Sequence, residues 1–178
     1  MANATPARTI DWPTTLDSLM VGVAHHISNR VAILSGISDL LANNTTIPPA
    51  VLQALATEVP KLEEAVRLFR LLPTPDETPE AIEPIRLVHD AIALATLHPG
   101  LKNITYTTDG GTNAQPVLVH PVACTHEILM AIVHAATEHH GDSLCISLNT
   151  VGDTVVITAG HHTVAAPTLL SARQPTPS

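Results

Sequence analysis

The chain has 178 residues, enough for one or two small domains, and 45% of them are hydrophobic, so a sizeable core can form. Only 2% of the residues are aromatic, so we expect that core to consist of Leu, Val, Ile and Ala. The formal charge is −8 and the eight Lys and Arg residues are scattered, which excludes the basic patch of a nucleic-acid-binding protein.

The sequence also lacks the features of a membrane or secreted protein. No apolar run approaches the roughly 20 residues that span a bilayer, and the N-terminal residues contain no signal-peptide core. Cys124 and Cys145 lie inside apolar segments and match no metal-binding spacing. We therefore expect a cytoplasmic protein with no membrane or nucleic-acid partner, in which both cysteines are buried free thiols.

After a flexible tail over residues 1–13, the longest helix pattern of the chain runs from Leu16 to Leu41, with Thr14 or Thr15 as its N-cap. Its apolar residues recur alternately three and four positions apart, which is typical of the seam of a helical bundle. Arg30 occupies one position of this seam. Its side chain is expected either to extend along the seam and place its charged end in solvent, or to pair with an acid across a dimer. The apolar members of the seam are Leu16, Met20, Val23, Ile27, Leu34, Ile37 and Leu41.

His25 points almost directly away from this seam, whereas His26 lies nearer its edge. A neutral imidazole is a good nucleophile near pH 7, and a face free of bulk lets another protein approach it closely. The alternative is an ordinary amphipathic helix with a histidine on its surface. The neighbours of His25 on the outer face are small or polar: Gly22, Ser28, Asn29, Ala32 and Gly36.

A second helix is predicted from Pro49 to Leu72, with Pro60 as a kink or restart. The two helices are expected to form an antiparallel hairpin over residues 14–72. One hairpin cannot cover both apolar seams, so a twofold homodimer that forms a four-helix bundle is the simplest arrangement.

Residues 73–84, with four prolines and four acids, are interpreted as a linker. The pattern over residues 85–166 predicts an α+β domain with helices on one face of a mixed or antiparallel sheet, followed by a tail over residues 167–178. The expected helices are Ile85–Leu97 and Val122–His139, and the expected strands are Asn103–Thr108, Pro116–His120, Leu144–Asn149 and Thr154–Thr158.

The run that follows His25 resembles the phosphoacceptor motif of sensor histidine kinases. In that motif a His precedes an acidic residue, Leu, Arg, Asn or Thr, Pro and Leu, and an apolar run then leads to a Gly. Two positions depart from it, because His26 replaces the acidic base and Arg30 replaces the kink-forming Pro. The resemblance implies that His25 accepts a phosphoryl group. The matching positions are His25, Ile27, Asn29, Val31, Gly36, Asp39, Leu40 and Leu41.

The order of elements over residues 82–160 resembles the ATP-binding domain of the same kinases, and residues 117–121 match its strand that ends in Asp-Pro. The residues that hold Mg·ATP are missing. The key Asn of the family falls on His134 or Ala135, and its Asp-x-Gly-x-Gly segment is replaced by residues 159–164, AGHHTV. The second half is therefore expected to be a small α/β sandwich similar to a kinase ATPase domain but without a nucleotide site.

A helical hairpin that keeps its histidine beside a degenerate ATPase domain resembles the histidine phosphotransferases of the ChpT type and the sporulation type. The resemblance implies a phosphorelay role in two-component signalling, without ATP-dependent kinase activity. The partners would be response-regulator receiver domains, which supply Mg²⁺, so that the chain needs no cofactor of its own.

His25 would be catalytic, and the candidate binding residues are Ser28, Asn29, Arg30 and Ala32. Two alternatives stay open: a catalytically inactive pseudokinase that serves as a dimeric docking module, and a fragment of a larger sensor kinase.

Two pairs of adjacent histidines, His139–His140 and His161–His162, are not expected to bind metal. Adjacent residues do not converge on one point of a helix or a strand, and no further ligands follow at a suitable spacing. The sequence therefore predicts no metal site.

Overall fold

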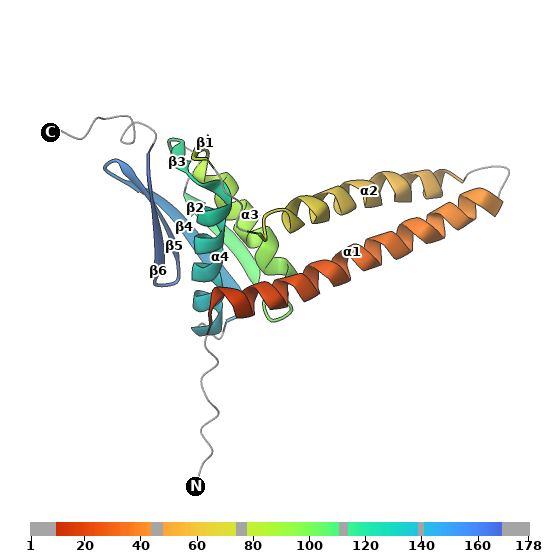
Figure 1. The fold of residues 1–178 in the computed structure, drawn as a ribbon, viewed down its shortest axis with the longest axis horizontal. Helices are drawn as coiled ribbons and strands as arrows, with labels where there is room; N and C mark the ends of the chain where they lie inside the picture. Colours follow the sequence, from red (N-terminus) through yellow and green to blue (C-terminus); the bar gives the residue numbers. More distant parts are fainter. Residues whose placement is uncertain (1–9, 44–47, 74–77, 111–113, 139–140, 169–178) are drawn as a thin grey trace, which may run out of the picture.

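The computed structural model describes residues 10–43, 48–73, 78–110, 114–138 and 141–168. These residues form an α+β fold with four helices, a four-stranded mixed sheet and a separate two-stranded sheet, which confirms the predicted class. Figure 1 shows the hairpin of the first two helices projecting away from the remainder. The elements are α1 Trp12–Asn43, α2 Pro49–Phe69, β1 Glu80–Ile82, α3 Pro84–Leu97, β2 Thr105–Gly110, β3 Val117–Val119, α4 Pro121–Glu138, β4 Ser143–Val151, β5 Thr154–Ala159 and β6 His162–Pro167.

Helix α1 begins earlier than the sequence predicts. Oδ1 of Asp11 accepts a hydrogen bond of 2.9 Å from the backbone N–H of Thr14, so Asp11 satisfies a free N–H of the first turn. The prediction of Thr14 or Thr15 as the cap was wrong, and Thr15 is buried. Of the predicted tail, residues 1–9 lie outside the described part, and the helix already begins at Trp12.

Helix α2 contains Pro60 in its interior and continues to Phe69, so Pro60 does not restart the helix.

The base of the hairpin is buried, and Leu19, Val23, Leu68 and Leu72 belong to the same hydrophobic cluster as the sheet. Leu19 is 0% exposed, whereas its neighbour Met20, a predicted member of the seam, is 40% exposed. The buried stripe is rotated toward Leu19 because the base of α1 packs against α3 as well as α2.

The segment interpreted as a linker contains secondary structure. Residues 74–77 lie outside the described part, but β1 pairs antiparallel with β3, with Ala81 opposite Leu118. Pro84 then occupies the first turn of α3, where its missing N–H costs no helical hydrogen bond. The linker interpretation was therefore wrong for residues 80–84.

The larger sheet has the order β2-β4-β5-β6. Strands β2 and β4 are parallel and the other pairs are antiparallel, so the sheet is mixed. Strand β6 was not predicted, because its sequence HTVAAP has small residues and no strong alternation. The predicted tail begins where β6 ends: Thr168 still bridges Val117, and residues 169–178 lie outside the described part.

Helices α3 and α4 cover one face of this sheet. In β4, Leu144, Ile146 and Leu148 point into the core, whereas Cys145 faces outward and is exposed. The prediction of two buried thiols was correct for Cys124 and wrong for Cys145, because strand alternation places Cys145 on the open face.

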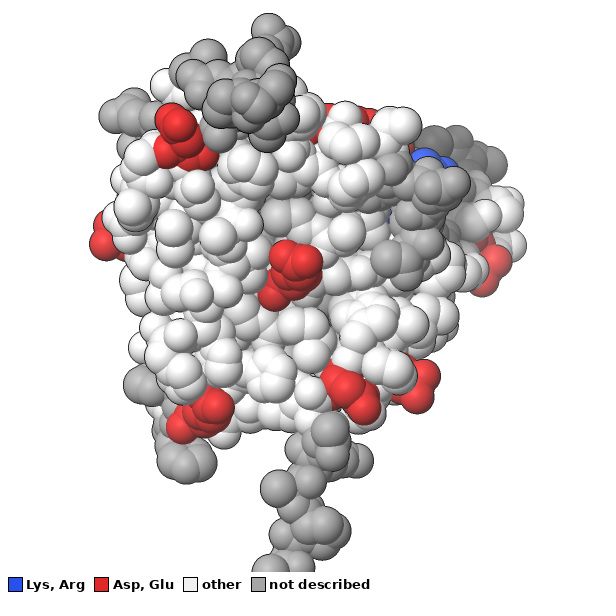
Figure 2. Space-filling model, turned by 60° about the vertical axis from the view of Figure 1, so that its left-hand side comes forward, with Lys and Arg blue, Asp and Glu red and all other residues white. Residues whose placement is uncertain are grey.

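One side of the molecule carries separated acidic side chains on an otherwise uncharged surface, with Lys and Arg atoms visible only at its edge (Figure 2). Among the described helices, none combines the length and the apolar character that crossing a membrane requires.

Candidate functional site

The site begins with His25 in the middle of α1, and its imidazole is exposed, as predicted. Asn29 lies one helical turn further on the same face. Its side-chain amide nitrogen Nδ2 is 3.0 Å from Nε2 of His25. When this amide donates to Nε2, the lone pair of the ring lies on Nε2 and the proton on Nδ1. Asn29 therefore orients the ring and selects its tautomer.

A hollow lies beside His25, between α1 and the segment that follows α3. The second half of the chain supplies one wall, and Lys102 is among the residues of that wall. Gly22 makes this approach possible, since a β-carbon there would overlap the carbonyl oxygen of Leu97. The residues that line the hollow are Val21, Gly22, His25, His26, Asn29, Thr96, Leu97, Pro99 and Lys102.

Only some of the predicted site residues lie at the hollow. Asn29 contacts His25, whereas Ser28 and Ala32 are exposed on α1 but do not line the hollow. His26 is half-buried, and its burial, followed by the positive charge of Arg30, lowers the pKa of its imidazole. His26 is therefore favoured in the neutral form and is less accessible than His25.

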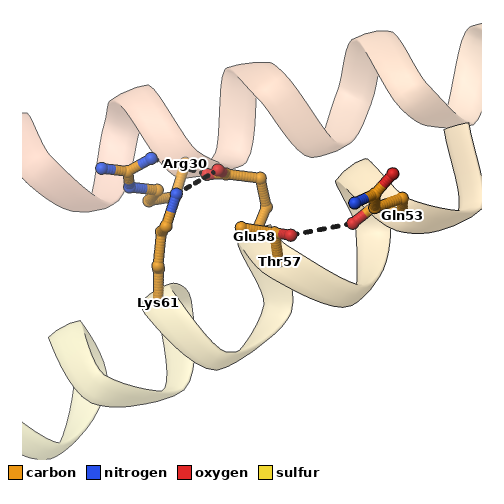
Figure 3. A network of polar contacts seen from close by, with 5 residues as sticks. All are labelled: Arg30, Gln53, Thr57, Glu58 and Lys61. Carbon is orange, nitrogen blue, oxygen red and sulfur yellow. Dashed lines mark hydrogen bonds and ion pairs between the residues drawn. The ribbon is translucent and has the colours of Figure 1, made fainter. Parts of the chain in front are cut away.

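Arg30 pairs with Glu58 of helix α2 (Figure 3). Its Nη1 donates to Oε2 of Glu58 at 2.6 Å, and Nζ of Lys61 donates to Oε1 of the same carboxylate at 2.8 Å. The hydrogen bond from Lys61, followed by that from Arg30, lowers the pKa of the Glu58 carboxyl.

This ion pair explains the charged residue in an apolar seam. Glu58 is buried on the facing side of α2 and supplies the counter-charge to Arg30 within the same chain. The acid that pairs with Arg30 therefore lies in the same hairpin, and not across a dimer as one prediction had it.

Sequence reasoning missed Thr96, Pro99 and Lys102, which reach the hollow from the second half of the chain. Their positions depend on how α3 packs against α1, and periodicity within one helix does not report such contacts. Gly22 was the available signal, since a glycine inside a helix often marks the close approach of another backbone.

A second group of polar residues lies at the end of α4. The turn between β5 and β6 packs against this helix, and a β-carbon on Gly160 would lie 3.2 Å from Cβ of Ala135. His161 and His162 both reach Oε2 of Glu138, at 3.1 Å and 3.0 Å. The expectation that adjacent histidines do not converge was wrong for this pair, because the turn lets both rings meet one carboxylate. The pair His139–His140 lies outside the described residues.

No protein-family model and no curated protein matches the chain. Solved structures that it is similar to include the histidine kinase AdeS of Acinetobacter baumannii, at 19% identity and a TM-score of 0.35 over 75% of this chain and 70% of that one. A bacterial phosphotransferase is 16% identical, with a TM-score of 0.43 over 84% and 68% of the two chains. A histidine kinase from Burkholderia phymatum STM815 is 14% identical, with a TM-score of 0.40 over 77% and 64%.

Proposed function

We propose that the chain is a phosphorelay histidine phosphotransferase in two-component signalling, and that His25 carries the phosphoryl group between receiver-domain aspartates. The observation that carries this proposal is the exposed imidazole of His25, whose Nε2 is oriented by Asn29 at the edge of a hollow. A nucleophile on a helix is held more rigidly than one on a loop. The surrounding surface leaves room for another protein domain.

The proposed chemistry is an in-line displacement at phosphorus. The Asn29 amide must first release Nε2 of His25, and the freed lone pair of Nε2 then attacks the aspartyl phosphate of the donor. The N–P bond forms, and the P–O bond to the aspartate breaks. The aspartate leaves as a carboxylate with the bonding electron pair, and Nδ1 of the ring then releases its proton to water. The reverse sequence transfers the phosphoryl group to the second receiver.

Donors near the ring would stabilise the phosphoryl oxygens during this transfer. Asn29 offers two amide hydrogens, and Lys102, which also lines the hollow, would supply a positive charge. Mg²⁺ would come with the receiver domain, so the chain needs no metal for this step. Arg30 is paired with Glu58, and we assign it to holding α1 against α2.

Receiver docking would use the exposed strip of α1 around His25, including Ser28, Asn29 and Ala32. These side chains are small and leave the imidazole accessible to a second protein. Lys102 lies beside this strip and would attract the acidic active site of a receiver.

We also propose a homodimer in which two hairpins form a four-helix bundle. Large apolar side chains remain exposed along both helices of the hairpin, and a second copy would cover them. Light scattering coupled to gel filtration tests this proposal, and a mass of one chain at micromolar concentration would contradict it. Apart from Val21, which lines the hollow beside His25, the exposed residues on the hairpin are Met20, Val31, Ile33, Leu40, Leu52, Val59, Val66 and Phe69.

In the deciding experiment, the full chain is mixed with receiver domains that carry an isotopically labelled phosphoryl group, and transfer of the label to the chain is measured. We expect acid-labile, base-stable phosphate on the chain and none on His25→Ala. His89→Ala, at an exposed histidine of α3, is the matched control and should become labelled like the wild type. Labelling of His25→Ala would contradict the assignment.

Two further results define the limits of the proposal. Receiver binding without any transfer would identify the chain as a docking module of the pseudokinase kind. We propose from the sequence that the chain has no nucleotide site, and binding of Mg·ATP measured by calorimetry would contradict this.

A further inference from the structure

A cluster of nitrogen and oxygen donors forms where the end of α4 meets the turn between β5 and β6. Glu138, His161 and His162 each place one ligand atom so that all three atoms lie within 4.8 Å of one another. We propose that this cluster binds a divalent transition-metal ion, with zinc as the preferred ion. The cluster shares no residue with the hollow beside His25.

The fold brings these three side chains together by specific local geometry. Gly160 has a φ of 61°, which lets the chain turn tightly between β5 and β6. Directly after the turn, His162 lies on the same face of β6 as the buried residues Val164 and Ala166, so its ring faces α4. Glu138 is the last residue of α4 and meets both imidazoles there.

The distances suit a small metal ion. The Nε2 atoms of His161 and His162 lie 3.1 Å and 3.0 Å from Oε2 of Glu138. Ligand atoms around a tetrahedral zinc ion are separated by roughly 3.3 Å, given bonds of about 2.0–2.1 Å. Binding of zinc would replace these hydrogen bonds with coordination by two neutral imidazoles and one carboxylate.

The donor set identifies the class of ion. Imidazole nitrogen favours Zn²⁺, Cu²⁺ and Ni²⁺, whereas Mg²⁺ and Ca²⁺ prefer oxygen ligands. Three protein ligands leave the fourth position of a tetrahedral zinc ion to water. His134 lies one helical turn before Glu138, and its ring centroid is 5.2 Å from that of His162, which adds a further imidazole beside the cluster.

Bound metal would connect α4 directly to the hairpin of β5 and β6. The exposed fractions of the side chains are 73% for His161, 50% for Glu138 and 26% for His162, so the ion can enter from solvent. An ion that binds only the folded chain stabilises it by mass action. The site therefore predicts a metal-dependent increase in the melting temperature.

The test uses the full chain, freed of metal with a chelator, and zinc chloride as the only added ligand. Calorimetry should show that the wild type binds one zinc ion with high affinity. Glu138→Gln and His162→Ala should each lower this affinity by about tenfold or more. The matched control is the double variant His89→Ala, His120→Ala, which removes two other exposed histidines. We expect it to bind zinc like the wild type. His120 precedes α4 and lies about 25 Å from Glu138 along the helix.

The melting temperature gives an independent readout. Zinc at about a hundred times its Kd should raise it by roughly 5–10 °C in the wild type and in the control, but not in the ligand variants. The far-ultraviolet circular dichroism of each variant without metal shows whether it is folded. Absence of zinc binding to the wild type, or unchanged affinity in Glu138→Gln and His162→Ala, would overturn the proposal.

Discussion

Gly22 of α1 lies directly against the carbonyl oxygen of Leu97 at the end of α3, and no β-carbon fits between them. The absence of a side chain at Gly22 lets α1 pack closely against α3, and Lys102, which follows α3, lines the same hollow as His25. Because the obstacle is backbone, a rotamer change cannot relieve an overlap at this position.

Replacement of Gly22 should therefore destabilise the fold. Replacing a glycine inside a helix with alanine normally raises the stability of the fold by about 1 kcal/mol. Gly36→Ala should show this increase, because no atom lies within 4 Å of the added β-carbon. Gly22→Ala should instead lower the free energy of unfolding by roughly 1–3 kcal/mol, because α1 must move away from α3 to make room for the β-carbon. Urea unfolding of both variants measures the difference. Equal stabilisation of the two variants would contradict the close contact.

Asn29 and Lys102 should affect phosphotransfer more than stability. Asn29→Ala removes the amide that orients the His25 ring and would donate to the phosphoryl oxygens. We expect transfer to slow by about tenfold or more, since hydrogen bonds to charged groups such as these oxygens contribute roughly 1.5–3 kcal/mol. Lys102→Ala should slow transfer, and Lys102→Arg should restore part of the rate. Rapid-quench kinetics with a phosphorylated receiver measures both effects. Arg86→Ala, which removes an exposed positive charge elsewhere on α3, should leave the rate unchanged.

The ion pair between Arg30 and Glu58 should show strong coupling. Glu58→Leu leaves the Arg30 guanidinium half-buried without its counter-charge and should lower the melting temperature markedly. The double variant Arg30→Leu, Glu58→Leu replaces the pair with apolar side chains in an apolar seam and should recover most of that loss. A double-mutant cycle by thermal unfolding measures this coupling. Additive single effects would show that the pair contributes little.

Acid should weaken the fold through His26. Burial, followed by the charge of Arg30, keeps the pKa of His26 below its usual 6.5, so the unfolded chain binds a proton more readily. The stabilisation is complete above the unfolded pKa and is lost as the pH falls through the folded pKa. His26→Gln should therefore lose less stability between about pH 7.5 and pH 5 than the wild type. His89→Gln is the control and should keep the wild-type loss. The charged groups near His26 are His25, Arg30, Glu58 and Lys61.

The two cysteines should differ sharply in reactivity. Burial raises the pKa of the Cys124 thiol to about 11, whereas Cys145 is exposed on the open face of β4. A disulfide reagent at neutral pH should modify Cys145 rapidly and Cys124 only on unfolding. Cys145→Ser should abolish the fast reaction without loss of fold. Fast modification of Cys124 in the native chain would contradict its burial.

The sequence predicted the parts of the fold that depend on local pattern. The helices and the strands β2 to β5 follow from periodicity and turn residues, and the exposure of His25 follows from its angle to the seam. Strands β1 and β6 carry no such pattern, since Glu80–Ile82 is short and His162–Pro167 is rich in small residues. Both strands exist because a neighbouring strand pairs with them.

The candidate site divides in the same way. The relation between His25 and Asn29 is one helical turn, so it can be read from spacing. The positions of Lys102 and Glu58 depend on how helices pack, and the convergence of His161 and His162 depends on a left-handed turn at Gly160. These relations are tertiary, and a single sequence does not report them.

The pairing of β2 with β4 also determines when the molecule can become complete. The two strands are parallel and α4 lies between them in the chain, so β2 waits for residues that leave the ribosome much later. Contacts between distant residues form slowly because the intervening loop must close first. We expect α3 to settle only when this pair forms, and the hollow beside His25 requires the end of α3. A partly synthesised chain would therefore contain the helix of His25 before the hollow beside it is complete.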